Sequence, residues 1–275
     1  MLSQEQVNFY QDRGWLHLPG MFDATQTQAM RDDLNWLIDT WADRSKGWTG
    51  PWRKQYMDEA TEQRSQLVAM HDLHFYSEAW MKGVTHSPLA AAIADLVDGP
   101  VELHHSTMHV KPPESGHPFP MHQDWAFYQH EDGRFVDVLV HLDDTSHANG
   151  EIRFVDGSHR DGPLEHVVRD PATGEPCTPH LPFEQYSLEN TTAVPARAGD
   201  VVLFSIHTLH GSHINTTDDM RRMVRVGYRH PDNRQTAGQS CGRPGLMVHG
   251  RRQRQPGQAL FTTEGPRVEA TAGVE

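Results

Sequence analysis

The stretches DVVLFSIHTLH at residues 200–210 and RMVRVGYRH at residues 222–230 decide the fold class of this chain. Apolar and polar residues alternate in both, and a period of two is typical of a β-strand with one buried face. Three upstream stretches show the same pattern, namely VELHHSTMHV at 101–110, FVDVLVHLDD at 135–144 and EIRFVD at 151–156. Asn149-Gly150 lies between the last two of these and predicts the turn of a β-hairpin.

The first hundred residues show a helical period instead. Helical spacing and capping residues predict three helices, at residues 3–13, 24–42 and 87–98. Ser3 and Gln6 form the capping-box pattern at the start of the first helix. Helices followed by many short strands predict the α+β class, with a double-stranded β-helix core of the jelly-roll or cupin type and the N-terminal helices packed on it.

We predict a single domain over residues 1–275. Residues 1–100 form its mainly helical N-terminal part, residues 101–235 the jelly-roll core, and residues 236–275 a C-terminal extension whose polar end is loosely packed. Residues 157–198 carry few strand or helix signals, so we interpret them as an insertion in the core.

Acidic residues outnumber Lys and Arg by 37 to 24, which gives a formal net charge of −13 at pH 7. Residues 1–220 carry 14 basic and 33 acidic side chains, net −19, whereas residues 221–275 carry 10 and 4, net +6. An acidic body argues against nucleic-acid binding, because neutralising phosphates needs a basic surface.

No apolar run is long enough for a membrane-spanning helix. Two cysteines make no disulfide framework, so we expect a reducing, cytoplasmic location.

His122-Gln123-Asp124 is the candidate start of a metal site. On an extended strand residues i and i+2 project to the same face, so His122 and Asp124 could present an imidazole nitrogen and a carboxylate oxygen to one ion. A third ligand has to come from a later strand, and the candidates are His207, His210 and His213. Two histidines and one carboxylate form the facial triad of non-haem Fe(II) oxygenases, whose open metal positions accept a 2-oxo acid and dioxygen.

The far carboxylate of a 2-oxo acid at such a metal needs a cation. Arginine suits this role, because it is always charged and can donate two parallel hydrogen bonds to a carboxylate. Arg221 and Arg222, which open the last strand-like stretch, are the candidates. The chain has no HEXXH or CXXC motif, which argues against a zinc site.

Four segments, in order along the chain, resemble the phytanoyl-CoA dioxygenase family of Fe(II)/2-oxoglutarate-dependent oxygenases. They are LSQEQVNFYQDRGWLHLPGMFDATQTQAMRDDL (2–34), KPPESGHPFPMHQDW (111–125), NGEIRFVDGSH (149–159) and GDVVLFSIHTLHGSHINTTDDMRRMVRVGYRH (199–230). The third segment has Asp156 where the family usually has proline. The resemblance implies a jelly-roll enzyme that uses Fe(II), 2-oxoglutarate and O2, and releases succinate and CO2 as it hydroxylates, desaturates or ring-closes a substrate.

The resemblance also implies the metal ligands. In the family the third ligand precedes Gly-Ser, which selects His210 and completes the set His122, Asp124 and His210. Halogenating relatives have a small residue at the position of Asp124. A carboxylate there therefore implies oxygen-rebound chemistry and not halogenation.

The co-substrate contacts follow from the same resemblance. The family's 2-oxoglutarate arginine lies eleven residues after the third ligand, which selects Arg221 over Arg222. Ser212 and Thr107 match two further family positions that contact 2-oxoglutarate. The 2-oxoglutarate lysine that some members have far upstream has no clear counterpart here.

Four residues are candidates for substrate contact. Trp125 and Phe127 directly follow the metal motif, and Trp52 and Arg53 lie in a segment at 45–66, rich in Trp, Arg, Gly and Pro, that we predict to be a loop or lid. Core packing is the competing explanation for all four.

The expected substrate is a small polar molecule. The family accepts acyl-CoA thioesters, small amino-acid derivatives and natural products. A polyanionic acyl-CoA is disfavoured by the acidic body and by the presence of only four lysines. We therefore expect a polar metabolite or natural product, such as a sugar, an aminoglycoside or an amino-acid derivative, acted on by a monomer or homodimer. The alternatives are an acyl-CoA hydroxylase, a cupin enzyme that needs no 2-oxo acid, and a non-catalytic cupin-like metal- or ligand-binding protein.

Overall fold

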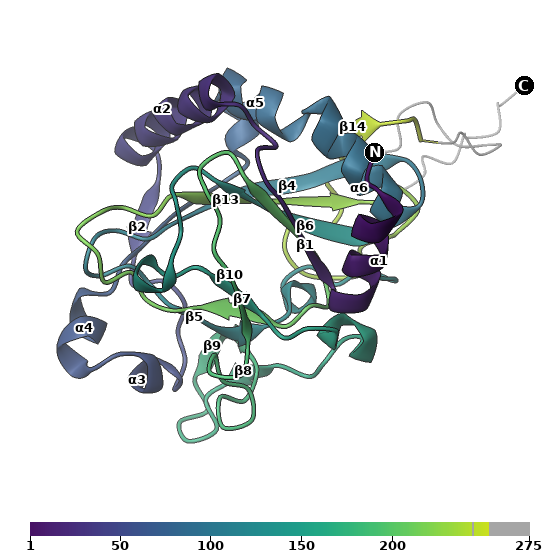
Figure 1. The fold of residues 1–275 in the computed structure, drawn as a ribbon. Coiled ribbons are helices and arrows are strands. Elements are labelled where there is room, and N and C mark those ends of the chain that lie inside the picture. Colours follow the sequence, from purple (N-terminus) through teal and green to yellow (C-terminus); the bar gives the residue numbers. More distant parts are fainter. Residues whose placement is uncertain (244, 253–275) are drawn as a thin grey trace, which may run out of the picture.

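In the computed structural model, which describes residues 1–243 and 245–252, an eight-stranded and a four-stranded antiparallel sheet face each other (Figure 1). The large sheet has the order β1-β11-β6-β13-β4-β3-β2, and β14 also pairs with β4. Its strands are β1 (Trp15–Leu18), β2 (Asp43–Ser45), β3 (Leu67–His71), β4 (Val101–Val110), β6 (Phe135–His141), β11 (Val201–Ser205), β13 (Met223–Arg229) and β14 (Leu246–His249). The small sheet has the order β10-β7-β12-β5, made of β5 (Phe119–His122), β7 (Ile152–Phe154), β10 (Thr192–Val194) and β12 (His210–Ser212). The predicted α+β class with a jelly-roll core is confirmed.

Helices cover the outer face of the large sheet. The α-helices are α1 (Gln4–Arg13), α2 (Ala24–Thr40), α3 (Arg53–Tyr56), α4 (Glu59–Arg64), α5 (Glu78–Val84) and α6 (Ser87–Val97), and the short 3-10 helices are η1 (Leu73–Phe75), η2 (Asp124–Ala126), η3 (His147–Asn149) and η4 (Ser158–Asp161). The predicted capping box of Ser3 and Gln6 starts α1. Helices α2, α5 and α6 lie on one side of the large sheet, and the small sheet lies on the other (Figure 1).

The alternation in the central strands separates a hydrophobic core from the functional interior. In β6, Val138 and Val140 pack into the core beneath the helices, whereas Leu139 belongs to the cluster between the sheets. In β13, Met223 and Arg225 line a cavity between the sheets. Successive strand residues point to opposite faces, so one sequence stretch supplies both the core and the site.

The stretch 200–210, predicted as a single strand, is two strands in different sheets, so this prediction was wrong. β11 ends at Ser205 in the large sheet, and β12 begins at His210 in the small sheet. Between them the chain turns, with the Thr208 backbone N–H donating to the Ser205 carbonyl at 2.8 Å. This crossover brings His210 opposite His122 of β5.

The predicted hairpin at Asn149-Gly150 is also wrong, although the turn itself is present. Ser146 and Asn149 form a capping box around η3, and Gly150 has a φ of 78°, in the left-handed region. The strands on either side do not pair. β6 pairs with β11 and β13, and β7 pairs with β10 and β12. Both edges of β6 are thus occupied, and the turn carries the chain from the large sheet to the small one.

The range 157–198, predicted as an insertion, supplies part of the small sheet. It contains β10, which pairs with β7, and a separate antiparallel pair, β8 (Val167–Arg169) and β9 (Pro176–His180). Residues 67–86, which show no clear helical or strand period in the sequence, form β3 and α5, and β3 extends the large sheet beside β4.

Part of the predicted C-terminal extension packs on the core. β14 pairs with β4 through residues 246–249, while residue 244 and most of the predicted loose tail, residues 253–275, lie outside the described residues. Within residues 1–243 and 245–252, no helix combines the length and apolar character needed to cross a membrane.

Candidate metal centre and co-substrate site

Three predicted metal ligands meet between the two sheets. His122 ends β5 and His210 begins β12, and the two lie opposite each other in the antiparallel pair. Asp124 follows at the start of η2. One ligand atom from each of the three residues lies within 4.8 Å of the others. The Nε2 atoms of His122 and His210 are 3.6 Å and 3.9 Å from Oδ1 of Asp124.

Backbone carbonyls orient both imidazoles. Nδ1 of His122 lies 2.8 Å from the Pro120 carbonyl, and Nδ1 of His210 lies 2.9 Å from the Thr208 carbonyl. A carbonyl only accepts, so each Nδ1 carries the proton and each Nε2 keeps its lone pair toward Asp124. Burial lowers the pKa of His210 to about 3, so its imidazole is neutral, as a metal ligand must be.

The Asp124 carboxylate is a buried anion with unused acceptor capacity. Burial alone would raise its pKa, but the charge of Arg225 and the two facing histidines bring the pKa well below its usual value. Its Oδ2 has no hydrogen-bond partner within the described part of the chain. A buried carboxylate with a free oxygen beside two imidazole lone pairs is a donor set that suits a divalent iron ion. His207 and His213, the other candidates, are not in this group.

Arg221 lies inside the barrel, and no carboxylate of the described residues forms an ion pair with it. It is 1% exposed, and its Nε and Nη2 atoms find no hydrogen-bond partner among the described residues. Its Nη1 contacts the Met223 sulfur at 3.2 Å. Burial lowers its pKa to about 10, so the guanidinium is still charged at neutral pH. A buried, charged and under-bonded arginine fits the far carboxylate of 2-oxoglutarate.

His141 is a second buried polar group near Arg221 that lacks hydrogen-bond partners among the described residues, and it was not predicted from the sequence. It faces Met223 in the strand register, is fully buried, and has no hydrogen-bond partner on either ring nitrogen within the described residues. Burial lowers its pKa to about 3, with the charge of Arg221 contributing. The alternation of the 135–144 stretch was the available signal, because it places residue 141 on the same face as 137 and 139.

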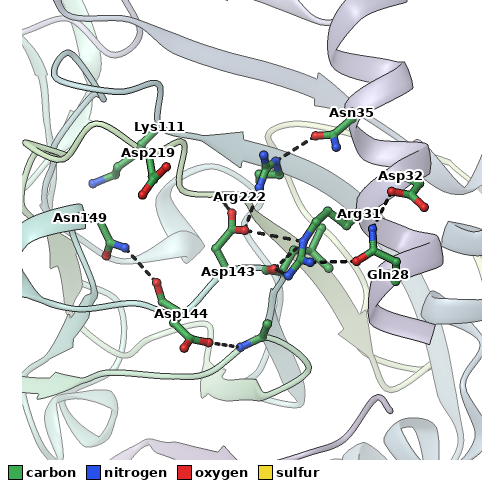
Figure 2. A network of polar contacts seen from close by, with 12 residues as sticks. Gln28, Arg31, Asp32, Asn35, Lys111, Asp143, Asp144, Asn149, Asp219 and Arg222 are labelled. Carbon is green, nitrogen blue, oxygen red and sulfur yellow. Dashed lines mark hydrogen bonds and ion pairs between the residues drawn. The ribbon is translucent and has the colours of Figure 1, made fainter. Parts of the chain in front are cut away.

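The neighbouring Arg222 is held outside the barrel (Figure 2). Its backbone N–H and Nη1 donate to the Asp143 carboxylate at 2.7 Å and 2.8 Å, and its Nε donates to Asn35 of α2 at 2.9 Å. Arg31 of α2 also lies 3.7 Å from Asp143. Consecutive residues point to opposite faces here, so only Arg221 of the two candidate arginines reaches the interior.

The other two predicted co-substrate residues occupy different positions. Ser212 lines the cavity beside the triad and accepts a hydrogen bond from the fully buried Lys111 Nζ at 2.8 Å. Thr107 is buried opposite Arg225 in the β4–β13 pair, and its hydroxyl is 2.9 Å from Nδ1 of His71. Thr107 is not among the residues that line the cavity.

The cavity beside the triad lies between the two sheets and beneath the 45–66 segment. Its lining residues are Trp48, His109, Phe119, His122, Leu139, Ile152, His210, Gly211, Ser212, Met223 and Arg225. Trp48 covers it from the 45–66 segment, with its ring centroid 4.7 Å from that of His122 and 4.8 Å from that of Phe127. This segment therefore contributes to the site through Trp48.

The four predicted substrate residues lie around this cavity at different distances. Phe127 contacts Trp48 and His122 at its edge, whereas the Trp125 indole N–H donates to the His130 carbonyl at 3.3 Å. Trp52 is fully buried among rings that include His117 and His180. Arg53 donates to the Trp48 carbonyl at 2.8 Å and pairs with Glu62 at 2.9 Å. None of the four is among the residues that line the cavity, and only Phe127 contacts two of those residues.

Arg225, on β13, was not singled out from the sequence. It is 6% exposed, lines the cavity, and its Nη1 donates to Oδ1 of Asp124. Its position four residues after Arg221 in an alternating strand places both arginines on the inner face. That spacing was the signal that could have found it.

This jelly roll holds two histidines and a carboxylate between its sheets, together with a buried arginine that forms no ion pair with the residues the structure describes. These features define the class of non-haem iron, 2-oxoglutarate-dependent oxygenases. Residues 10–223 match the phytanoyl-CoA dioxygenase (PhyH) family, and the chain belongs to this family.

Known relatives agree with this class. A probable alpha-ketoglutarate-dependent hypophosphite dioxygenase of Stutzerimonas stutzeri is 29% identical over 259 residues, which cover 90% of this chain and 86% of that protein. An ectoine dioxygenase of Halomonas elongata is 25% identical over 268 residues, which cover 90% of this chain and 76% of that protein. The crystal structure of the non-heme alpha ketoglutarate dependent carbocyclase SnoK from nogalamycin biosynthesis has a TM-score of 0.69 at 24% identity, covering 91% of this chain and 94% of that chain.

The fold and the family are those that the sequence predicted. The chain is a non-haem iron, 2-oxoglutarate-dependent dioxygenase of small metabolites, with iron as its metal and 2-oxoglutarate as its co-substrate.

Proposed function

We propose that this enzyme hydroxylates a small polar metabolite of the amino-acid-derivative or simple-anion type. One atom of O2 enters the substrate as a hydroxyl group, the other enters succinate, and 2-oxoglutarate loses CO2. The main observation behind the proposal is the position of Arg221, two of whose nitrogens lack hydrogen-bond partners among the described residues. It lies in the same barrel interior as the triad of His122, Asp124 and His210.

The chain's own residues would bind and orient the reactants. His122, Asp124 and His210 would hold the iron, which when bound supplies the activation of dioxygen. Arg221 would pair with the far carboxylate of 2-oxoglutarate, and Ser212, fixed by Lys111, would donate to the same co-substrate from the cavity wall. The Trp48 ring would keep water from the reacting atoms.

The two relatives named above support a small polar substrate. Hypophosphite and ectoine are both compact molecules, and each carries an anionic oxygen group. A bulky acyl-CoA agrees less well with a cavity that Trp48 covers closely. The two cysteines are both free, in keeping with the reducing cytoplasm that we also propose. We further propose that the enzyme acts as a monomer or homodimer.

Coupled turnover tests the proposal. Purified enzyme with added Fe(II), 2-oxoglutarate and a panel of amino acids and small oxyanions should consume O2 and release succinate in equal amounts. Asp124→Ala should abolish this turnover, and Asp39→Ala, which removes an exposed carboxylate from α2, should not. Full coupled turnover by Asp124→Ala would refute the ligand assignment. A wild type that binds neither Fe(II) nor 2-oxoglutarate would instead point to a non-catalytic cupin-like protein.

A further inference from the structure

The cavity beside the triad carries an uneven charge. Aromatic and aliphatic side chains form much of its wall, and Arg225 is the one arginine in it. Among the described residues that line the cavity there is no aspartate, glutamate or lysine. The other ionisable residues of the lining are three histidines, His109, His122 and His210. The Asp124 carboxylate that contacts Arg225 would be a ligand of the metal, so Arg225 supplies the one permanent charge among the lining residues, and a guanidinium in a concave site favours an anionic ligand.

We infer that the substrate carries an anionic oxygen group, a carboxylate, phosphinate, phosphonate or sulfonate, and that Arg225 binds this group. The inference rests on the proposed function and narrows its substrate class. Arg221, on the same inner face of the barrel, binds the co-substrate in the proposed function. Each arginine therefore binds one of the two anions, Arg221 the co-substrate and Arg225 the substrate.

The Arg225 guanidinium does not use all of its N–H donors within the described part of the chain. A guanidinium offers five N–H donors. Nη1 donates to Asp124, while Nε has no hydrogen-bond partner in the described part of the chain. The Asp137 carboxylate is 4.0 Å from Nε, beyond hydrogen-bonding distance, and both its oxygens accept from the Tyr128 hydroxyl at 2.9 Å. The guanidinium also lies over the Tyr128 ring, 5.3 Å from its centroid, which fixes its plane.

The strand next to Arg225 presents neutral polar groups. Thr107 is opposite Arg225 in the register, and its hydroxyl contacts His71. His109, two residues on, lines the same cavity. Burial, followed by the charge of Arg225, lowers the pKa values of His71 and His109, so both are uncharged. Neutral donors and acceptors beside one cation suit a compact oxyanion.

The contact of Arg225 with a metal ligand limits the size of the substrate. A group held by Arg225 lies next to Asp124, so the bond to be oxidised is close to the anionic group. A single arginine matches one anionic group, and the net charge of −19 over residues 1–220 disfavours a polyanion. A small monoanionic or zwitterionic compound meets both conditions.

Calorimetry on the full-length enzyme tests the inference. The enzyme is loaded anaerobically with Fe(II) and saturating 2-oxoglutarate, then titrated with hypophosphite, methylphosphonate, L-proline and ectoine. L-Prolinamide and dimethyl methylphosphonate are the matched compounds without the anionic group. We expect at least one of the four compounds to bind, L-proline or methylphosphonate to bind about tenfold or more tightly than its match without the anionic group, and Arg225→Gln to remove that preference.

Two further variants separate anion binding from support of Asp124. Arg225→Lys keeps the charge and should keep part of the anion affinity. Arg222→Gln removes the same type of side chain from the outer face of the same strand region and should leave anion affinity unchanged. Equal loss of anion affinity in Arg225→Lys and Arg225→Gln would show that Arg225 only holds Asp124, and would overturn the inference.

Other results would also overturn it. One is the failure of all four compounds to bind the loaded wild type. The other is a weaker affinity of Arg225→Gln for 2-oxoglutarate with an unchanged affinity for the four compounds. The second result would assign Arg225 to the co-substrate. Failure of the proposed function looks different, because it is the absence of succinate release by the wild type, whereas calorimetric anion binding does not depend on turnover.

Discussion

At the scale of a single residue, the burial and charge of Arg221 lead to a prediction about the affinity for 2-oxoglutarate. Its guanidinium is buried and charged, and two of its nitrogens lack a partner among the described residues. Arg221→Gln should therefore raise the KM for 2-oxoglutarate by about tenfold or more, with a smaller effect on kcat at saturation. Arg222→Gln should leave this KM unchanged, because Arg222 binds Asp143 and Asn35 on the other side of the sheet. Initial-rate kinetics with varied 2-oxoglutarate check both, and equal effects of the two substitutions would contradict the assignment.

His141 allows a test that does not depend on activity. Both of its ring nitrogens are buried without partners in the described residues, and such a group destabilises a fold by about 1–3 kcal/mol. His141→Leu should therefore raise the thermal stability of the protein without ligands. The same substitution should reduce the stabilisation that 2-oxoglutarate with Fe(II) gives, if His141 donates to the co-substrate. Thermal unfolding with and without these ligands measures both effects, and a substitution that lowers stability would argue against this account.

At the scale of elements, the alternation of apolar and polar residues predicted where the central strands lie, but it did not predict which strands pair with one another. β4, β6 and β13 match the stretches 101–110, 135–144 and 222–230, because buried strands of seven to ten residues show a clear period. The small sheet consists of strands of three or four residues, too short for a clear period, and of these only β7 lies in a stretch, 151–156, that was predicted as a strand of its own.

The difference between local patterns and strand pairing also explains why only some residues of the candidate site could be predicted from the sequence. His122, Asp124, His210 and Arg221 stand in local motifs, so the sequence could point to them. Trp48, His141 and Arg225 belong to the site through pairing and crossing of segments that are distant in sequence. Their roles depend on strand register and on the path of the 45–66 segment, and neither is encoded in a short motif.

The 45–66 segment is an element whose position depends on one arginine. Arg53 donates to the Lys46 and Trp48 carbonyls at 2.9 Å and 2.8 Å and to Glu62 at 2.9 Å. Arg53→Met should loosen the segment, so that Trp48 covers the cavity less well and more 2-oxoglutarate is consumed without substrate oxidation. Lys54→Met, at the exposed neighbouring position, is the control. The ratio of succinate to oxidised product measures the effect, and an unchanged ratio in Arg53→Met would show that the cover does not depend on this anchor.

For the molecule as a whole, the many histidines predict a steep loss of stability in acid. Burial lowers the pKa of His104 and His141 to about 3 and that of His130 to about 4. In the unfolded chain these side chains bind protons below about pH 6.5. The unfolded state thus takes up protons that the folded state does not, and stability falls as pH decreases from about 6.5 toward the folded pKa values.

The size of this effect is comparable to the stability of a domain. At pH 4.5 each of these histidines should cost about 2–3 kcal/mol, against a usual total of about 5–15 kcal/mol. The metal-free protein should therefore unfold well above pH 3, as followed by circular dichroism. His141→Leu should move the acid midpoint to lower pH, because it removes one such proton-binding site, whereas His249→Gln, at an exposed position of β14, should not. A midpoint that is the same in all three proteins would mean that acidic unfolding is governed by other groups, such as the paired carboxylates.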